Sequence, residues 1–418
     1  MRSAKWLRIV VLVTMIFTLA GTSIIAQEDE EDKDWGTVTI AAGDPIKLGF
    51  SAALTGAGVD VLGIDEQRGA ELAVADVNEA GGVLGFEIEL DIQDSLCSAE
   101  GGVTVANRFV SDESMVAVVG HMCSAACSAA EEIYADAGYS MVSPSCTAIA
   151  LTAPSNVSEI FSRTAWNDRS QAPAAAEFLI SQGVERVATI HDGSVYGEGL
   201  VNGMADAFID LGGEVVAELA INVGDTDMRS ILEEIAAQEP DAIYFGGFPA
   251  EGAFLAQQRA DVGLEDVLFM GADGIKATAY IEAVGEAGCN TYASAADPAT
   301  VEGGSYEKFV ERYKEDYGEA PTAPFHAHAY DALMIIAAAI EEVGEVDDDG
   351  NLTIDRLALR DAIRATEDYE GLTGVLTCDE YGDCGVSASI SVVELSCEGD
   401  EPEFVTVWPE VEEEEADE

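Results

Sequence analysis

Short apolar strands alternate with helices along most of this chain, and the alternation restricts the fold to one class. Strand-like runs such as "PIKLGFSAAL", "FEIELDIQDS" and "MVAVVGHM" are separated by helix-like runs such as "DEQRGAELAVADVNEAGG" and "AEGGVTVANRFVSD". The pattern restarts at "ERVATIHDGS" and continues through "DAIYFGGF" and "VLFMGADG". Such alternation is typical of βαβ units in a mostly parallel sheet. The sequence therefore predicts the α/β class, with two doubly wound parallel-sheet lobes.

Three helix-like runs follow the second set of strands without strands for a third sheet: "SYEKFVERYKEDYG", "APFHAHAYDALMIIAAAIEEVG" and "DRLALRDAIRAT". They must cover one of the two lobes, so the chain crosses between the lobes more than once. We therefore expect a hinged clamshell. Its first lobe is predicted to contain residues 45–165 and 297–375, and its second lobe residues 166–296 and 376–400.

The chain carries a net charge of −61, from 80 Asp and Glu against 19 Lys and Arg. Nucleic acid is therefore not expected as a partner, because phosphate binding needs a basic surface. So large a charge repels itself in ordinary buffer, whereas in molar salt the Debye length falls to about 3 Å and the repulsion is screened. The composition predicts a salt-adapted protein; an exported protein that is simply acidic is the alternative.

The amino-terminal run "MRSAKWLRIVVLVTMIFTLAGTSIIA" has basic residues first, then an apolar stretch, then small residues. This layout predicts a secretory signal peptide over residues 1–26 and an exported protein, in the periplasm or on the extracellular side of the membrane. An uncleaved anchor is the alternative, because the apolar stretch nearly reaches membrane-spanning length. Acidic stretches at 27–44 and 401–418 are predicted to be a solvated linker and a solvated tail.

Export changes the interpretation of the eight cysteines. In an oxidising compartment an even number favours disulfides, whereas zinc binding would require paired short CxxC spacings, which this sequence lacks. The stretch "CDEYGDC" has turn residues between Cys378 and Cys384 and predicts a small disulfide loop. We expect no metal ion and no cofactor.

One candidate ligand contact lies where a strand ends in "GHMCSAACS" and a helix begins at Ser124. In open parallel sheets, ligands bind beyond the carboxyl ends of the strands. The first N–H groups of this helix and the Ser124 hydroxyl are suited to a carboxylate. Cys123 is placed to pair with Cys97 at the end of the preceding strand, which would stabilise this corner by roughly 3 kcal/mol. The alternative is a helix-capping serine beside two inert core sulfurs.

A second strand end, in "SPSCT", provides Ser145, Cys146 and Thr147, whose carbonyls and hydroxyls can bind an ammonium group. Asp273, in "MGADG" of the second lobe, can supply a negative charge opposite them. Together these residues would form a site for a zwitterion. The alternative is that Asp273 is one more solvated surface acid.

Catalysis has few candidate residues. The chain has four histidines, and no strand end combines a nucleophile with a base. The glycines of "GAGVDVLG" do not match the dinucleotide-binding spacing, and no Walker lysine lies near them. We therefore do not expect an enzyme.

Four stretches resemble, in the same order, the leucine/isoleucine/valine-binding family of periplasmic solute-binding proteins: "KLGFSAALTGAGVDVLGIDEQRGAELAVADVN", "VGHMCSAACSAAEEIYADAGYSMVSPSCT", "HDGSVYGEGL" and "FMGADGI". The resemblance extends over nearly all of residues 45 to 395. It implies the type I periplasmic binding fold, an α-amino acid held between the lobes, and delivery of that ligand to the membrane permease of an ABC transporter. We also expect a monomer.

The resemblance implies roles for individual residues. Ser124 and Thr147 would bind the carboxylate and ammonium groups of the ligand, beside backbone atoms of Ser145 and Cys146. Tyr196, in "VYGEG", would be the aromatic contact from the second lobe.

Three positions depart from the family. Asp273 matches a position where the family often has Glu, and would pair with the ligand's ammonium group. Leu62 stands where an aromatic residue often lines the side-chain pocket, and Phe248 stands where Tyr is common. The last two changes keep the pocket apolar and remove hydroxyls, which favours an aliphatic ligand.

Two of the cysteines, Cys97 and Cys123, match a family disulfide. Four others fall outside the family pattern: Cys127, Cys146, Cys289 and Cys397. Pairing the first two of these would staple both halves of the site and would leave the last two for each other, but the sequence leaves this pairing open.

These observations predict an extracytoplasmic solute-binding protein that captures an amino acid, in particular Leu, Ile or Val, by hinge closure. One alternative keeps the fold but binds a small amide or a urea-like solute. A second alternative is a ligand-sensing module that reports to a receptor.

Overall fold

The computed structural model describes residues 34–56, 58–155, 158–296, 305–385, 390–399 and 401–409. The signal peptide predicted for residues 1–26 lies outside these ranges. The description that follows concerns the compact unit Trp35–Glu418. Within the described ranges, every helix is too short or too polar to cross a bilayer.

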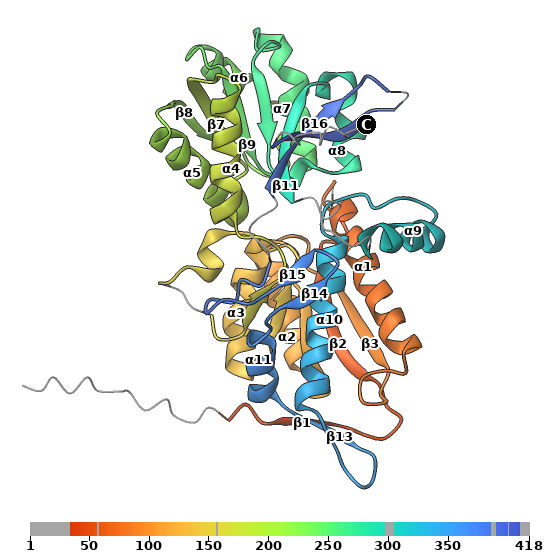
Figure 1. Ribbon diagram of the computed structural model, residues 1–418. Helices are drawn as coiled ribbons and strands as arrows, with labels where there is room; N and C mark the ends of the chain where they lie inside the picture. The colour runs from red at the N-terminus through yellow and green to blue at the C-terminus, as the bar shows by residue number, and fades with distance from the viewer. Residues whose placement is uncertain are drawn as a thin grey trace, which may run out of the picture. The chain divides into compact units, whose positions relative to one another are not determined.

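The first lobe is built on a parallel sheet whose described strands follow the order β3-β2-β4-β5-β6 (Figure 1). In that order the strands are Ile88–Asp94, Ile46–Ala52, Met115–Gly120, Met141–Ser143 and Phe161–Arg163. Helices cover both faces: α1 (Asp60–Glu79), α10 (His326–Val343) and α11 (Arg356–Arg364) on one, α2 (Ala99–Val110) and α3 (Ser124–Ala137) on the other. Adjacent strand residues point to opposite faces, so Val118 packs with α2 and α3 and Val119 packs with α1 and α10. This two-sided burial explains the unbroken apolar run of β4.

The second lobe is built on a mixed sheet whose described strands follow the order β17-β16-β11-β10-β9-β7-β8. In that order the strands are Glu403–Trp408, Ile390–Ser396, Thr291–Ala296, Leu268–Gly271, Ala242–Gly246, Arg186–His191 and Glu214–Ala220. The pairs β11–β16 and β16–β17 are antiparallel and the others are parallel. One face packs on α4 (Asp168–Ser181) and α5 (Val195–Asp210), the other on α6 (Arg229–Ala236), α7 (Pro249–Gln258) and α8 (Thr278–Val284).

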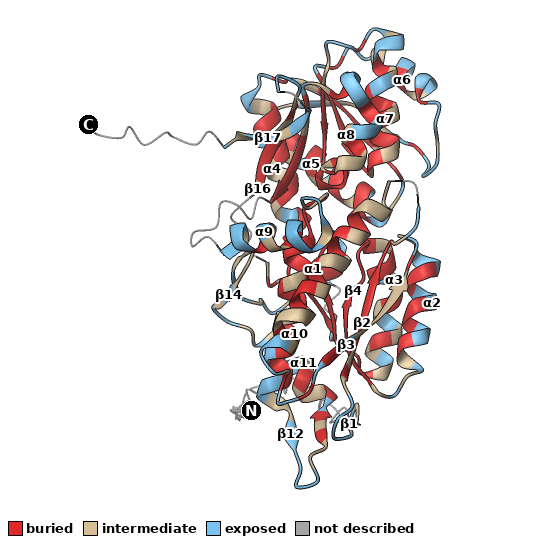
Figure 2. Cartoon of the chain, turned by 90° about the vertical axis from the view of Figure 1, so that its right-hand side faces the viewer, coloured by how far each residue is buried: buried red, intermediate tan, exposed pale blue. Residues whose placement is uncertain are grey.

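The predicted α/β class with two mostly parallel sheets is therefore confirmed. Figure 2 shows the strands of both sheets largely buried, with exposed residues on the outer faces of helices such as α2 and α6. The chain connects the two sheets between β6 and α4, again after β11, and again before β16. Helix α9 (Ser305–Tyr317) packs on α1 of the first lobe, where Phe309 and Tyr313 contact Leu72.

The prediction of a solvated linker over residues 27–44 is wrong for Thr37–Ile40, because these residues form strand β1. β1 pairs with β13 (Leu352–Asp355), and β13 pairs with β12 (Glu345–Val346), both antiparallel. Val38 and Ile40 are buried, so this short stretch has the alternation of a half-buried strand.

Two other boundaries also differ from the prediction. Residues Glu403–Trp408, predicted as part of the acidic tail, form β17 at the edge of the second sheet. The segment 376–385, assigned to the second lobe, lies against the first, where it follows the hairpin β14 (Tyr369–Gly371) and β15 (Gly374–Leu376). Its carboxylate Asp383 forms an ion pair with Arg163 of β6 at 2.6 Å.

All eight cysteines lie in the described ranges, and all are paired. The four disulfides are Cys97–Cys123, Cys127–Cys146, Cys289–Cys397 and Cys378–Cys384. The first two lie at the start of α3. The third joins the segment before β11 to the end of β16 and so ties the edge of the second sheet to its parallel part.

The lengths of the closed loops lead to a prediction about stability. Cys289–Cys397 closes a loop with a sequence separation of 108, whereas Cys378–Cys384 closes one of 6. Because loop-closure entropy grows with length, replacing Cys289 and Cys397 by serine should lower the free energy of unfolding by about 4–5 kcal/mol. Replacing Cys378 and Cys384 by serine should lower it by about 2 kcal/mol. Urea unfolding of both variants in molar salt measures the difference, and equal losses would contradict the loop-length argument.

Candidate binding site

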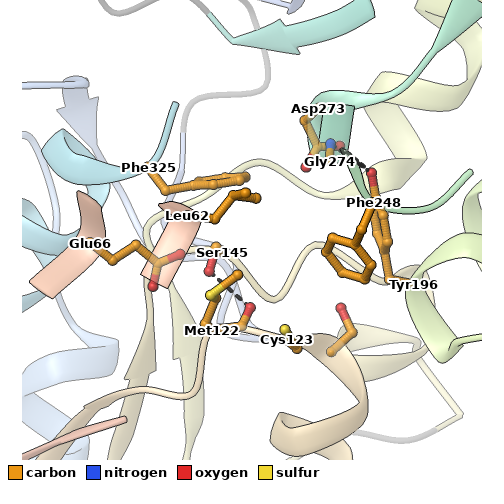
Figure 3. A pocket seen from close by; sticks show the side chains of 11 residues that line it. Leu62, Glu66, Met122, Cys123, Ser145, Tyr196, Phe248, Asp273, Gly274 and Phe325 are labelled. Carbon is orange, nitrogen blue, oxygen red and sulfur yellow. Dashed lines mark hydrogen bonds between the residues drawn. The ribbon is translucent and has the colours of Figure 1, made fainter. Parts of the chain in front are cut away.

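A cavity lies where strand ends and helix starts of both sheets meet. Its lining residues are Leu62, Glu66, Met122, Cys123, Ser124, Ser145, Tyr196, Phe248, Asp273, Gly274 and Phe325 (Figure 3). The centre of a water-sized sphere can move within about 20 Å³ among these residues, and the space free of protein atoms, counted out into open solvent, is about 300 Å³. Its position beyond the carboxyl ends of parallel strands is the one expected for this class of sheet.

The start of α3 forms one polar corner of the cavity. α3 begins at Ser124, and no described side chain caps its first turn. Ser124 Oγ accepts a hydrogen bond from the N–H of Ala148 at 3.3 Å, which leaves the hydroxyl proton for donation. The helix N-terminus also carries partial positive charge. This corner can therefore bind a carboxylate, and the Cys97–Cys123 disulfide holds it in place.

The end of β5 contributes Ser145 to the lining, but Cys146 and Thr147 do not reach the cavity. Ser145 Oγ donates a hydrogen bond to the carbonyl of Met122 at 2.8 Å. The carbonyl of Cys146, which was expected beside the ligand, accepts a hydrogen bond from Arg163 Nη1 at 2.7 Å, and its sulfur is bonded to Cys127. The backbone of Cys146 is thus already engaged within the protein.

Asp273 brings a buried carboxylate to the second-lobe side of the cavity. It begins the short 3-10 helix η3 (Asp273–Ile275), directly after β10. Its Oδ1 accepts hydrogen bonds from the Tyr196 hydroxyl and from Gln171 Nε2, each at 2.8 Å. Gly274 allows this arrangement, because a Cβ there would lie 2.3 Å from the carbonyl of Gly247. The hydrogen bonds fix the orientation of Asp273 before any ligand arrives.

The cavity environment shifts the titration of Asp273. Burial raises the pKa of Asp273 from 3.8 to about 6, and the hydrogen bonds from Gln171 and Tyr196 oppose this rise. The aromatic ring of Phe248 lies 5.6 Å from that of Tyr196, centroid to centroid, so the same side of the cavity is both acidic and apolar.

A second acid, Asp168, lies close to Asp273 at the start of α4. Asp168 is fully buried, and neither of its carboxylate oxygens has a hydrogen-bond partner among the described residues. Burial raises the pKa of Asp168 well above its usual value, and the charge of Asp273 raises it further. The Thr147 hydroxyl is likewise buried and unpartnered within the described chain, while its carbonyl accepts from the N–H of Asp168 at 3.0 Å. Thr147 is thus placed next to the acids and not on the cavity wall.

Helix α1 brings Leu62 and Glu66 to the cavity, one turn apart. A Cβ on Gly63 would lie 1.8 Å from the carbonyl of Ala53, so only glycine lets α1 approach the segment after β2 this closely. Glu66 is fully buried, and neither of its carboxylate oxygens has a hydrogen-bond partner among the described residues. Burial raises the pKa of Glu66 well above its usual value, and the charge of Asp65 raises it further.

The structure thus brings together six of the eight candidate ligand residues, namely Leu62, Ser124, Ser145, Tyr196, Phe248 and Asp273. Sequence reasoning missed the lining residues Glu66, Met122, Cys123, Gly274 and Phe325 and the supporting residues Gln171 and Asp168. Met122, Cys123 and Gly274 adjoin predicted residues, and Glu66 follows Leu62 by four positions on a helix, which was a usable signal. Phe325 precedes α10, far along the chain, and no local pattern indicated it.

Comparisons with known proteins identify the family to which the chain is similar. Residues 45–395 match the family model described as periplasmic binding protein. The leucine-, isoleucine-, valine-, threonine-, and alanine-binding protein of Pseudomonas aeruginosa is 32% identical over 344 residues, which are 82% of this chain and 88% of that protein. The crystal structure of the leucine-binding protein LivK from Thermotoga maritima MSB8 has a TM-score of 0.76 at 28% identity, covering 87% of this chain and 99% of that one. The substrate-binding protein LivJ from Streptococcus pneumoniae, in complex with isoleucine, has a TM-score of 0.73 at 26% identity, covering 87% and 100%.

The raised pKa of Asp273 leads to a prediction for the unliganded protein. Since the folded-state pKa of about 6 lies above the unfolded value of 3.8, Asp273 contributes stability below about pH 4 that is lost as the pH rises through about 6. Asp273→Asn should therefore stabilise the protein at pH 8 by up to about 3 kcal/mol and should change its stability little at pH 3.5. Urea unfolding at both pH values measures this, and an equal effect at the two would refute the assignment.

Proposed function

Because the chain belongs to the periplasmic binding protein family, and within it to the substrate-binding proteins of branched-chain amino acid ABC transporters, we propose that it binds a branched-chain or similar α-amino acid and delivers it to a transporter permease. Its family is described as periplasmic binding protein, and its relatives are named as amino-acid-binding proteins and not as enzymes. No chemical change of the ligand is therefore proposed.

The observation that carries the proposal is the buried carboxylate of Asp273 in a cavity without a cation. None of the described residues that line the cavity is Lys, Arg or His. A ligand ammonium group would supply the missing positive charge and form charge-assisted hydrogen bonds. The start of α3 with Ser124, on the first-lobe side, would bind the ligand carboxylate. The two polar corners together match the two charges of a zwitterion.

Four further lining residues are apolar and can pack against the hydrocarbon part of a ligand side chain. Leu62, Met122, Phe248 and Phe325 contribute hydrocarbon or thioether surface to the cavity. Burial of an aliphatic side chain against such surface contributes about 1.5–3 kcal/mol. Because the lining residues come from both lobes, a ligand that contacts both favours the state in which the lobes are close, and that state would be the one presented to the permease.

The ligand class is tested by thermal unfolding in high salt with a panel of amino acids, small amides and urea. Leu, Ile or Val should raise the unfolding midpoint, since a ligand at a hundred times its Kd stabilises the folded state by about 2.7 kcal/mol. Asp273→Lys should abolish that shift, because it places a like charge beside the ligand ammonium. If only amides or urea raised the unfolding midpoint, the ligand would be a neutral solute and not an amino acid. If no compound raised it, a sensing module would be favoured.

The pH dependence of binding tests the ammonium contact separately. An ammonium group binds the ionised form of Asp273, whose pKa in the free site is about 6. The Kd of the amino acid should therefore be nearly constant from pH 7 to 8 and should rise by up to about tenfold per unit as the pH falls below about 6. Calorimetric titration measures this, and Asp273→Asn should remove the rise.

Asp331 provides a matched control for this titration. Burial also raises the pKa of Asp331 to about 6, but this residue lies outside the cavity lining and accepts hydrogen bonds from Leu372 and Thr373. Asp331→Asn should leave the pH dependence of binding unchanged. If it removed the rise in Kd as Asp273→Asn does, the contact between Asp273 and the ligand ammonium would be refuted.

A further inference from the structure

The cavity has a second polar wall that the zwitterion does not use. Glu66 lines the cavity on α1, is fully buried, and has no hydrogen-bond partner at either oxygen among the described residues. In Figure 3 its carboxyl group lies beside Ser145 and Met122, on the side of the cavity away from Tyr196, Phe248 and Asp273. Buried polar groups are almost always hydrogen-bonded, so an unpartnered carboxyl at a cavity wall calls for a partner that enters the cavity.

The protein itself does not provide that partner. The Ser145 hydroxyl donates its proton to the carbonyl of Met122 at 2.8 Å, and no hydrogen bond in either direction joins it to a Glu66 oxygen. The other neighbours on this side of the cavity, Leu62 and Phe325, are apolar. The ligand ammonium group, held by Asp273 on the opposite side, cannot serve both acids.

We infer that Glu66 binds a hydrogen-bond donor on the side chain of the ligand, so that the site prefers amino acids with a side-chain hydroxyl or amide over alkyl side chains of the same shape. This inference rests on the proposed function and adds a specificity-determining residue to it. An alkyl side chain can still bind against the apolar lining, but it leaves the Glu66 carboxyl without a partner, which weakens its binding relative to a polar side chain of the same shape.

The state of the Glu66 carboxyl agrees with a neutral partner. Burial favours its protonated form, and the charge of Asp65 favours it further. A protonated carboxyl has one O–H donor and free acceptor oxygens, which together complement a hydroxyl or a primary amide. The ligand side chain then needs no second positive charge.

Two pairs of amino acids of matched shape test the inference: threonine with valine, and asparagine with leucine. Calorimetry in high salt gives the Kd of each for the wild-type protein, Glu66→Met and Glu66→Gln. The wild type should prefer the polar member of at least one pair. Glu66→Met should reduce that preference by about tenfold or more, the loss expected for one hydrogen bond to a buried carboxyl. Glu66→Gln keeps a donor and an acceptor and should keep most of the preference.

Leu62→Met is the control, since it changes the shape of the same wall without changing its polarity. It should change the Kd values of both amino acids of a pair by the same factor. An unchanged preference in Glu66→Met would overturn the role of Glu66 and leave the proposed function intact. A wild-type preference for valine and leucine over their polar partners would also overturn it, even if Glu66→Met does not fold. Failure of all four amino acids to bind would overturn the proposed function and this inference together.

Discussion

Burial of three carboxyl groups, none of which forms an ion pair with a described residue, is the condition that the rest of the site depends on. Asp273, Asp168 and Glu66 are all inside the protein, and burial raises the pKa of each. Asp273 alone is compensated by two hydrogen bonds from neighbouring side chains. Desolvated carboxylates are stabilised most by a positive charge or by hydrogen-bond donors at short range. The two of these groups that line the cavity, Asp273 and Glu66, are therefore the ones that we propose select the ligand.

The first-lobe half of the cavity is held by covalent and steric constraints. Disulfides Cys97–Cys123 and Cys127–Cys146 join the start of α3 to the segments that follow β3 and β5. Gly63 lets α1 lie against the segment after β2, which places Leu62 and Glu66 on the cavity wall. A site held in its binding geometry loses little conformational entropy when the ligand arrives. The lobe that we propose binds the ligand carboxylate is thus preorganised.

The fold was predictable because helix and strand periodicity repeats over most of the chain, and because the cavity position follows from parallel sheet topology. Ser124 and Asp273 were found for that reason, since each lies within four residues of the carboxyl end of a strand. Local patterns failed where a distant segment decides the contact. The guanidinium of Arg163, on β6, donates a hydrogen bond to the carbonyl of Cys146. Arg163 is fully buried, and sequence periodicity does not indicate a buried arginine. β17 was missed because acidic residues on both sides obscured the alternation of "EFVTVW".

Strands β1 and β17 have a consequence for how the chain can be attached and observed. β1 pairs with β13 in the first lobe, whereas β17 pairs with β16 in the second. The polypeptide thus enters through one lobe and leaves through the other. A tether joined on the N-terminal side of Thr37 would hold the first lobe and leave the second free to move. Fluorophores placed before Thr37 and after Trp408 would accordingly report the distance between lobes, with no label near the cavity.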